Sequence, residues 1–204
     1  MFFEEFLNKI LKRVVDNTFG GYRLKYEESF RTAGKSPMHG HYTIILRDAA
    51  TGSIIEQRDG SNIIVNSASV LIARLLKDSK EPDGGITYLA VGTGVPGWNL
   101  QNPPQPTNTQ TKLFNEIARK AFTTDDVSFI DPDTGDPTVV PTNVVDFTAT
   151  FAETEAVGPL VEMALFGGDA TDLTDSGTEV NFRTFPVINK SNSMTMSIIF
   201  RITC

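Results

Sequence analysis

Apolar residues recur with a helical period at the start of the chain and with a strand period over most of the remainder. In FFEEFLNKILKRVV, residues 2–15, they fall along one continuous stripe of a helix. Glu4 and Glu5 stand in the first turn, with Lys12 and Arg13 near the end, as the helix dipole favours. We expect this stripe to make an assembly contact, carried by Phe2, Phe3, Phe6, Leu7, Ile10 and Leu11.

Such a helix must bury its stripe on another surface. Docking on its own domain and docking on a neighbouring subunit are both open. A membrane surface fits less well, because the polar face carries charges of both signs. Residues 17–40 contain several glycines, Pro37 and mixed charges, which indicates an extended arm. The pattern therefore predicts an N-terminal helix and arm over residues 1–40 and a core domain over residues 41–204.

Residues 41–65 predict a β-hairpin. HYTIILRD and SIIEQRDGSNIIV flank the turn sequence DAATG, and the first of these segments alternates apolar and polar positions. SASVLIARLLKD then predicts a helix that Asn66 or Ser67 caps. Its expected buried face consists of Val70, Leu71, Ala73, Leu75 and Leu76.

The rest of the chain is dominated by strand patterns. VVDFTATF, LVEMALFGG and MTMSIIFRIT have period-two alternation, and residues 123–130 form a further candidate strand. LFNEIARKAF, residues 113–122, fits either a short helix or an extended segment. We expect a mainly β fold of the α+β class: an antiparallel β-sandwich core with an N-terminal amphipathic helix and one or two internal helices.

The stretch ITYLAVGTGVPG has the glycine spacing of a dinucleotide-binding fingerprint, at Gly92, Gly94 and Gly97. That fingerprint requires a helix to begin at the glycines, so that its N–H groups hold the pyrophosphate. Pro96 and the prolines at 103, 104 and 106 prevent a helix here. Gly92 and Gly94 more simply allow a sharp turn at the end of a strand.

Composition excludes several classes of function. The formal charge of −7, without a long basic cluster, argues against nucleic-acid binding. No apolar run approaches about 18 residues, so we expect no transmembrane helix. The amino end lacks the pattern of a secretory signal. Cys204 is the sole cysteine, which excludes a disulfide framework and leaves the compartment undecided.

No constellation of chemistry-bearing residues stands out. The acidic loop of Asp131, Asp133 and Asp136 departs from the calcium-binding EF-hand pattern, since Gly135 comes fifth and a threonine stands at the twelfth position. His39 and His41 flank Gly40 without further candidate ligands in view. We therefore predict no catalytic residue, no metal site, no bound cofactor and no enzymatic activity. An envelope-degrading hydrolase is the weakest alternative.

An ordered series of short motifs resembles a widespread group of tailed-phage virion proteins, usually described as tail, neck/collar or tail-fibre structural proteins. The motifs are NIIVNSASVLIARLL, ITYLAVGTG, LFNEIARKAF, VDFTATF, LVEMALFGG and FPVINKSNSMTMSIIFRI. The likeness spans roughly residues 41–204 and depends on the order of the motifs. The chain departs from the pattern at Met163 and Ala164, where the family usually has a small or β-branched residue and then glycine.

The resemblance implies a structural protein of the virion, assembled in the host cytoplasm as a symmetric oligomer. Its expected partners are copies of itself, in a ring or trimer, and neighbouring proteins of the neck/collar, tail, baseplate or fibre. Trp98, between Gly97 and Asn99, is a further candidate assembly anchor, although packing on its own domain would explain it equally well. The alternative is a receptor- or glycan-binding fibre or a capsid decoration protein.

Overall fold

The computed structural model describes residues 38–77 and 84–204. The N-terminal helix, its six apolar positions and nearly all of the arm predicted for residues 1–40 lie outside the described residues. The elements within them are β1 (His39–Asp48), β2 (Ile54–Ile64), α3 (Asn66–Lys77), β3 (Gly84–Gly92), β4 (Glu116–Ala121), η1 (Thr124–Asp126), β5 (Val127–Ile130), β6 (Pro137–Thr138), β7 (Val144–Phe151), β8 (Gly158–Gly168), β9 (Thr178–Lys190) and β10 (Met194–Thr203).

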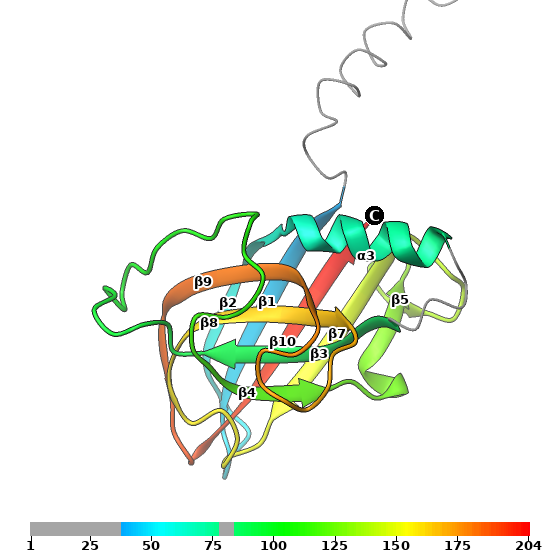
Figure 1. Cartoon of the computed structure of the whole chain (residues 1–204). Helices are drawn as coiled ribbons and strands as arrows, with labels where there is room; N and C mark the ends of the chain where they lie inside the picture. Colours follow the sequence, from blue (N-terminus) through cyan, green and yellow to red (C-terminus); the bar gives the residue numbers. More distant parts are fainter. Residues whose placement is uncertain (1–37, 78–83) are drawn as a thin grey trace, which may run out of the picture. The chain divides into compact units, whose positions relative to one another are not determined.

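All strands within the described residues belong to one antiparallel sheet with the order β4-β3-β8-β9-β2-β1-β10-β7-β5-β6 (Figure 1). The mainly β, antiparallel prediction is therefore confirmed. The predicted β-sandwich with two separate sheets is not confirmed. Strand β2 joins one half of the sheet, β4-β3-β8-β9, to the other half, β1-β10-β7-β5-β6. Along most of its length β2 pairs with β1, whereas its last residues, Ile63 and Ile64, pair with Phe182 and Asn181 of β9.

The main core lies where the two halves of this sheet face each other. Tyr42, Ile44 and Leu46 on β1 and alternate residues of β10 contribute from one half. Leu89 and Val91 on β3 and Met163 and Leu165 on β8 contribute from the other. Strands β3, β4 and β8 cross in front of β1, β10 and β7 in Figure 1. Removing these apolar faces from water is the main force that holds the halves together.

Strand β8 is buried on both faces, which simple alternation did not predict. Met163 and Leu165 enter the main core, as expected from their shared face. Ala164 and Phe166, on the other face, enter a second cluster with Val65, Leu113 and Phe182. The half-sheet β4-β3-β8-β9 is therefore covered on its outer face too, by the long loop between β3 and β4.

The hairpin predicted for residues 41–65 is confirmed. β1 and β2 pair from Gly40↔Asn62 to Arg47↔Ile54, with one irregularity next to Leu46. Asp48 closes the turn because its carboxylate accepts hydrogen bonds from the backbone N–H groups of Ala50 and Thr51. The first and last strands of the described residues are also neighbours in the sheet, since His39 of β1 pairs with Thr203 of β10.

Helix α3 is confirmed, but its predicted buried face is largely wrong. Ala68 and Leu71 are buried, whereas Val70, Ala73, Leu75 and Leu76 are exposed. The sheet selects the buried side: Leu71 lies over Gly167 of β8, where an added Cβ would be 3.1 Å from its Cδ2 atom. Consequently α3 is apolar on two sides.

Residues 113–122 contain a strand and no helix, so the helical alternative for this segment is wrong. Residues 116–121 form β4, paired with β3 through Tyr88↔Ala121 and Ala90↔Arg119. Pairing and two-sided packing override the helical spacing, since Ala118 faces the main core while Arg119 lies against aromatic rings on the other face. Of the predicted strand 123–130, the first part is the turn η1 and the remainder is β5.

Candidate functional site

The most distinctive surface of the described residues covers the outer face of β4-β3-β8-β9. Two loops form it: residues 93–115, between β3 and β4, and residues 169–177, between β8 and β9. Each is held by a buried charged group of the sheet. We call them the proline-rich loop and the acidic loop.

Glu162 of β8 anchors the proline-rich loop at both ends. It is fully buried, and its carboxylate accepts hydrogen bonds from the N–H groups of Gly94 (3.0 Å), Phe114 (3.0 Å) and Asn115 (2.8 Å). Three donors satisfy a charge that would otherwise be costly to bury. Thus one side chain joins the beginning of the loop to its end.

The glycines of AVGTG are explained by this junction. A Cβ at Gly92 would lie 2.5 Å from both the carbonyl oxygen of Asn115 and Oε1 of Glu162, so no side chain fits. Gly94 has φ +64°, and a Cβ there would lie 2.5 Å from the Trp98 ring. The structure shows these glycines permitting close approach and a left-handed turn, as the sequence suggested, and no helix follows them within residues 93–115.

Trp98 is partly buried and packs on its own domain through an edge-to-face contact with Phe114, with ring centroids 4.9 Å apart. Phe114 is 48 % exposed and also contacts Phe182 of the second cluster. Val95 and Leu100 of the same loop are exposed as well. The loop therefore offers solvent an aromatic surface on a fixed base. Whether Trp98 takes part in assembly stays a prediction.

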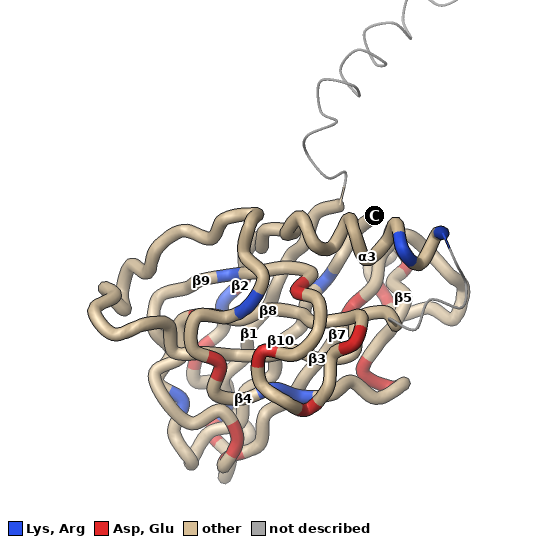
Figure 2. The backbone as a smooth tube through the Cα atoms, in the orientation of Figure 1, with Lys and Arg blue, Asp and Glu red and all other residues tan. Residues whose placement is uncertain are grey.

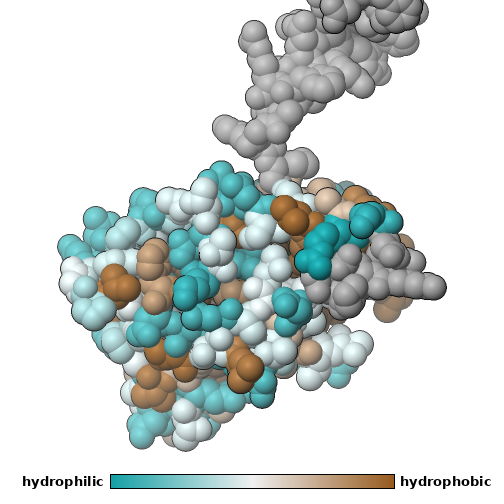
Figure 3. Space-filling view, in the orientation of Figure 1, coloured by the Kyte–Doolittle hydropathy of each residue, from teal (hydrophilic) through white to brown (hydrophobic). Residues whose placement is uncertain are grey.

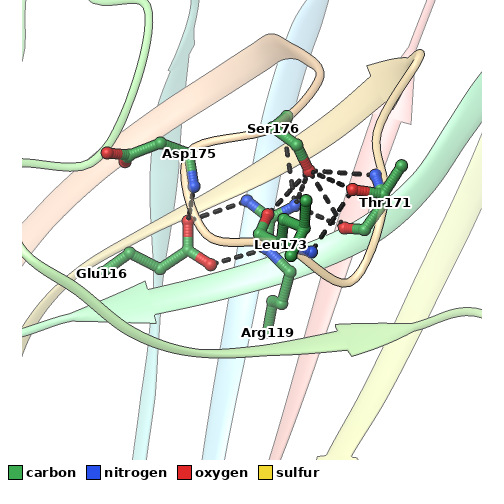
Figure 4. Close-up of polar contacts among 6 residues, drawn as sticks. All are labelled: Glu116, Arg119, Thr171, Leu173, Asp175 and Ser176. Atoms are coloured by element: carbon green, nitrogen blue, oxygen red, sulfur yellow. Dashed lines mark hydrogen bonds and ion pairs between the residues drawn. The ribbon is translucent and has the colours of Figure 1, made fainter.

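The acidic loop is held by an ion pair between Glu116 and Arg119 of β4, at 2.6 Å, with both side chains almost completely buried. Arg119 also donates to the carbonyl oxygen of Thr171 (2.7 Å) and to the hydroxyl of Ser176 (2.7 Å). Glu116 accepts from the N–H of Asp175 (3.1 Å) (Figure 4). Because both members of the pair bond the loop, breaking the pair would release it.

The guanidinium of Arg119 lies between two aromatic rings of the sheet. Its central carbon is 5.5 Å from the ring centroid of Tyr88 and 5.1 Å from that of Phe166. Stacking of this kind favours the flat, delocalised arginine cation over a lysine. Arg119 therefore connects the aromatic layer below to the acidic loop above.

Glu179 of β9 is a buried acid of a different kind. It is 1 % exposed, and both of its carboxylate oxygens lack a hydrogen-bond partner among the described residues. Burial, and to a smaller extent the negative charge of Glu162, raise its pKa to about 9. Glu179 is consequently protonated at neutral pH, unlike a surface glutamate.

The side chains considered for metal binding do not come together. Asp131 accepts hydrogen bonds from the N–H groups of Asp133 and Thr134 within its own turn. The Nε2 atom of His41 lies 4.0 Å from Oδ1 of Asp59. Within residues 38–77 and 84–204, no group of three or more His, Cys, Asp or Glu side chains is placed to hold a metal ion. Among the same residues, no helix is both long and apolar enough to cross a membrane.

Sequence reasoning missed the charged residues that organise this surface, namely Glu116, Arg119, Glu162 and Glu179. A usable signal did exist for Glu162, which is the lone charge in the apolar segment LVEMALF. A charge in a buried strand must be paired or multiply hydrogen-bonded. Sequence alone could not show which backbone groups would supply those bonds.

Comparison with known proteins gives one match. Residues 62–158 match the family described as "Baseplate wedge 3 tail fiber network component". The match relates this part of the chain, which runs from the end of β2 to the start of β8, to a family of phage tail proteins. Neither the curated proteins nor the solved structures contain a match.

Proposed function

We propose that this protein is a non-enzymatic structural component of a tailed-phage virion that assembles as a symmetric oligomer in the tail or its baseplate. The match of residues 62–158 to a baseplate and tail-fibre network family carries the proposal. A neck or collar position is the less favoured variant. The protein would join the virion during assembly in the host cytoplasm.

The described surface supports a role based on contact. Its two loops are fixed by buried groups, Glu162 and the Glu116–Arg119 pair, so their exposed side chains are already ordered before a partner arrives. Ordering in advance reduces the entropy lost on binding. The partners would be copies of this chain, in a ring or trimer, and neighbouring virion proteins.

Two groups of residues are proposed as assembly contacts. The first is the apolar stripe of the predicted N-terminal helix, whose six residues would be buried on another copy: Phe2, Phe3, Phe6, Leu7, Ile10 and Leu11. The second is Trp98 with its neighbour Phe114. Burial at roughly 25 cal/mol per Å² makes either contact a sizeable contribution to assembly.

An electron cryomicroscopy map of the virion that encodes this chain tests the proposal. We expect density for the ten-stranded sheet in repeated, symmetry-related copies within the tail or baseplate. Density confined to the capsid, or the absence of the chain from purified particles, would contradict it. Mass spectrometry of the same particles provides an independent check of presence.

A receptor- or glycan-binding fibre module is the second candidate, and the exposed ring of Phe114 beside Trp98 favours it. Aromatic faces stack on sugars, and the amide residues Asn99 and Asn102 follow Trp98 in the sequence. Host-envelope glycans that quench the fluorescence of Trp98, with loss of the effect in Phe114→Ala, would support this function. No quenching at millimolar glycan would exclude it for this surface.

A further inference from the structure

Leu173 is an exposed apolar residue at the tip of the acidic loop. Its side chain is 69 % exposed, yet its backbone is held on both sides. Its N–H donates to the hydroxyl of Thr171 (3.3 Å), and its carbonyl oxygen accepts from the hydroxyl of Ser176 (2.7 Å). A large apolar side chain held in this way gains free energy if a partner removes it from water.

The loop beneath Leu173 is tightly closed. Asp175 adopts φ +61°, a conformation that side-chain-bearing residues seldom take, and its N–H is bonded to Glu116. At Gly177 an added Cβ would lie 2.4 Å from the Cβ of Ala170, so the two ends of the loop touch. Leu173 is thus presented by a preorganised support, and a partner would lose little entropy in binding it.

Acidic side chains lie beside this apolar tip, although the carboxylate of Asp175 is paired with Lys112 of the same copy at 3.1 Å. Asp169, Asp172 and Asp175 belong to the same loop, and Asp172 is exposed. Figure 2 shows acidic positions along this part of the molecule. The fitting surface should therefore combine an apolar patch with a positive rim.

Helix α3 provides such a surface. Val70, Ala73 and Leu76 follow one another at three-residue intervals on its solvent side, with Val70 60 % and Leu76 82 % exposed. Arg74 and Lys77 occupy the last turn of the helix, where Figure 2 shows basic positions. Apolar surface is visible at this end of the molecule in Figure 3.

We propose that Leu173 of one copy packs on the Val70–Ala73–Leu76 stripe of a second copy, with Asp172 facing Lys77 of that copy. The proposal rests on the proposed function only in requiring self-association. The two surfaces comprise different residues, so the contact is heterologous and propagates head to tail. It closes into a ring when the rotation between copies allows.

Analytical ultracentrifugation of the full chain over a range of concentrations tests this contact. We expect Leu173→Asp and Leu76→Asp each to weaken self-association by about tenfold or more, because a charged side chain replaces a buried apolar one. Ile54→Asp is the matched control: Ile54 is 52 % exposed but lies next to the hairpin turn, at the end of β2 remote from α3, and should leave association unchanged. Circular dichroism verifies folding of every variant.

Reversing the charges of Asp172 and Lys77 tests their contact between copies more specifically. Lys77→Glu and Asp172→Lys should each weaken association by about threefold to tenfold, and the double variant should recover it. An oligomer unaffected by Leu173→Asp, or a double variant no better than the weaker single one, overturns this contact and leaves the proposed function standing. A wild-type chain that is monomeric at every concentration overturns both.

Discussion

Gly92 and Glu162 lie so close together that no side chain fits at position 92. A Cβ at Gly92 would lie 2.5 Å from the Oε1 atom of Glu162, the same atom that accepts the N–H groups of Gly94 and Asn115. The obstacle on the other side is the backbone carbonyl of Asn115, which cannot move without shifting β4. The glycine of AVGTG is therefore part of the anchor of the proline-rich loop.

Gly92→Ala should lower the free energy of unfolding by about 1–3 kcal/mol, the usual cost of overpacking. Urea unfolding followed by the fluorescence of Trp98, the sole tryptophan, measures it. Gly85→Ala is the matched control on the same strand, because an added Cβ there meets nothing within 4 Å. Equal stability of the two variants would contradict the close-approach explanation.

Glu162→Gln should also destabilise the protein, by about 2–3 kcal/mol, because the charge is lost and an NH₂ group would face N–H donors. The emission of Trp98 should shift in the folded state, since the loop loses its anchor. Glu153→Gln, at an exposed position, is expected to change neither quantity. An unshifted emission spectrum would show that Glu162 does not position the loop.

Glu179 should give the protein a pH-dependent stability. Its pKa of about 9 in the folded state exceeds the ordinary 4.5, so the folded state holds the proton more tightly than the unfolded chain. The stability associated with this proton is fully present below pH 4.5 and is lost as the pH rises towards 9.

Replacing Glu179 by Gln removes this dependence. Relative to wild type, Glu179→Gln should gain about 3 kcal/mol of unfolding free energy between pH 4.5 and pH 7. Denaturant titrations at several pH values give the difference directly. A difference that does not vary with pH would show that the carboxyl is not held protonated.

Arg119→Leu should cost about 3–5 kcal/mol, because it leaves the Glu116 carboxylate buried without its cation. The acidic loop should open locally, which faster hydrogen exchange of the amides at residues 171–176 would report. Adding Glu116→Gln should recover part of the loss, since no uncompensated charge remains. If exchange in the loop stays at the wild-type rate, the ion pair is not what holds it.

Deletion of residues 1–16 should leave a folded core and weaken association, because the deletion removes the predicted apolar stripe. Sedimentation velocity and circular dichroism measure the two properties. A matched variant that retains the segment but replaces Phe3, Leu7 and Ile10 with serine should behave like the deletion. A truncated chain that associates as well as the full one would contradict the role of the stripe.

Local patterns predicted much of the fold. The hairpin and α3 were predictable because a turn residue such as Asp48 and the spacing of apolar residues along a helix both act over a few positions. Which side of α3 faces outward was not predictable, because Val70 and Leu76 are as apolar as Leu71. Packing against strands that are distant in sequence, for example of Leu71 on Gly167 of β8, selects which side is buried. The strand at residues 116–121 was ambiguous for the same reason: its partner decides its conformation.

The candidate site was less accessible from sequence. Trp98 could be singled out as a ring in a polar loop, but its contact with Phe114 depends on how Glu162 draws the loop ends together. Glu116 and Arg119 stand in a segment with helical spacing, which obscured their shared role. Their shared role is to bond the backbone of residues 171–176, a segment about fifty residues later in the chain, and only the folded structure shows it.

The pairing of β1 with β10 constrains when the domain can form during synthesis. His39 and Thr203 are partners at opposite limits of the described sheet, and β10 separates β1 from β7. On the ribosome, the part of the sheet formed by β2-β1-β10-β7-β5-β6 therefore stays incomplete until β10 has left the exit tunnel. Contacts so distant along the chain make folding slow and leave strand edges exposed meanwhile. Chaperone capture of nascent chains should consequently be strongest before residues 194–203 emerge.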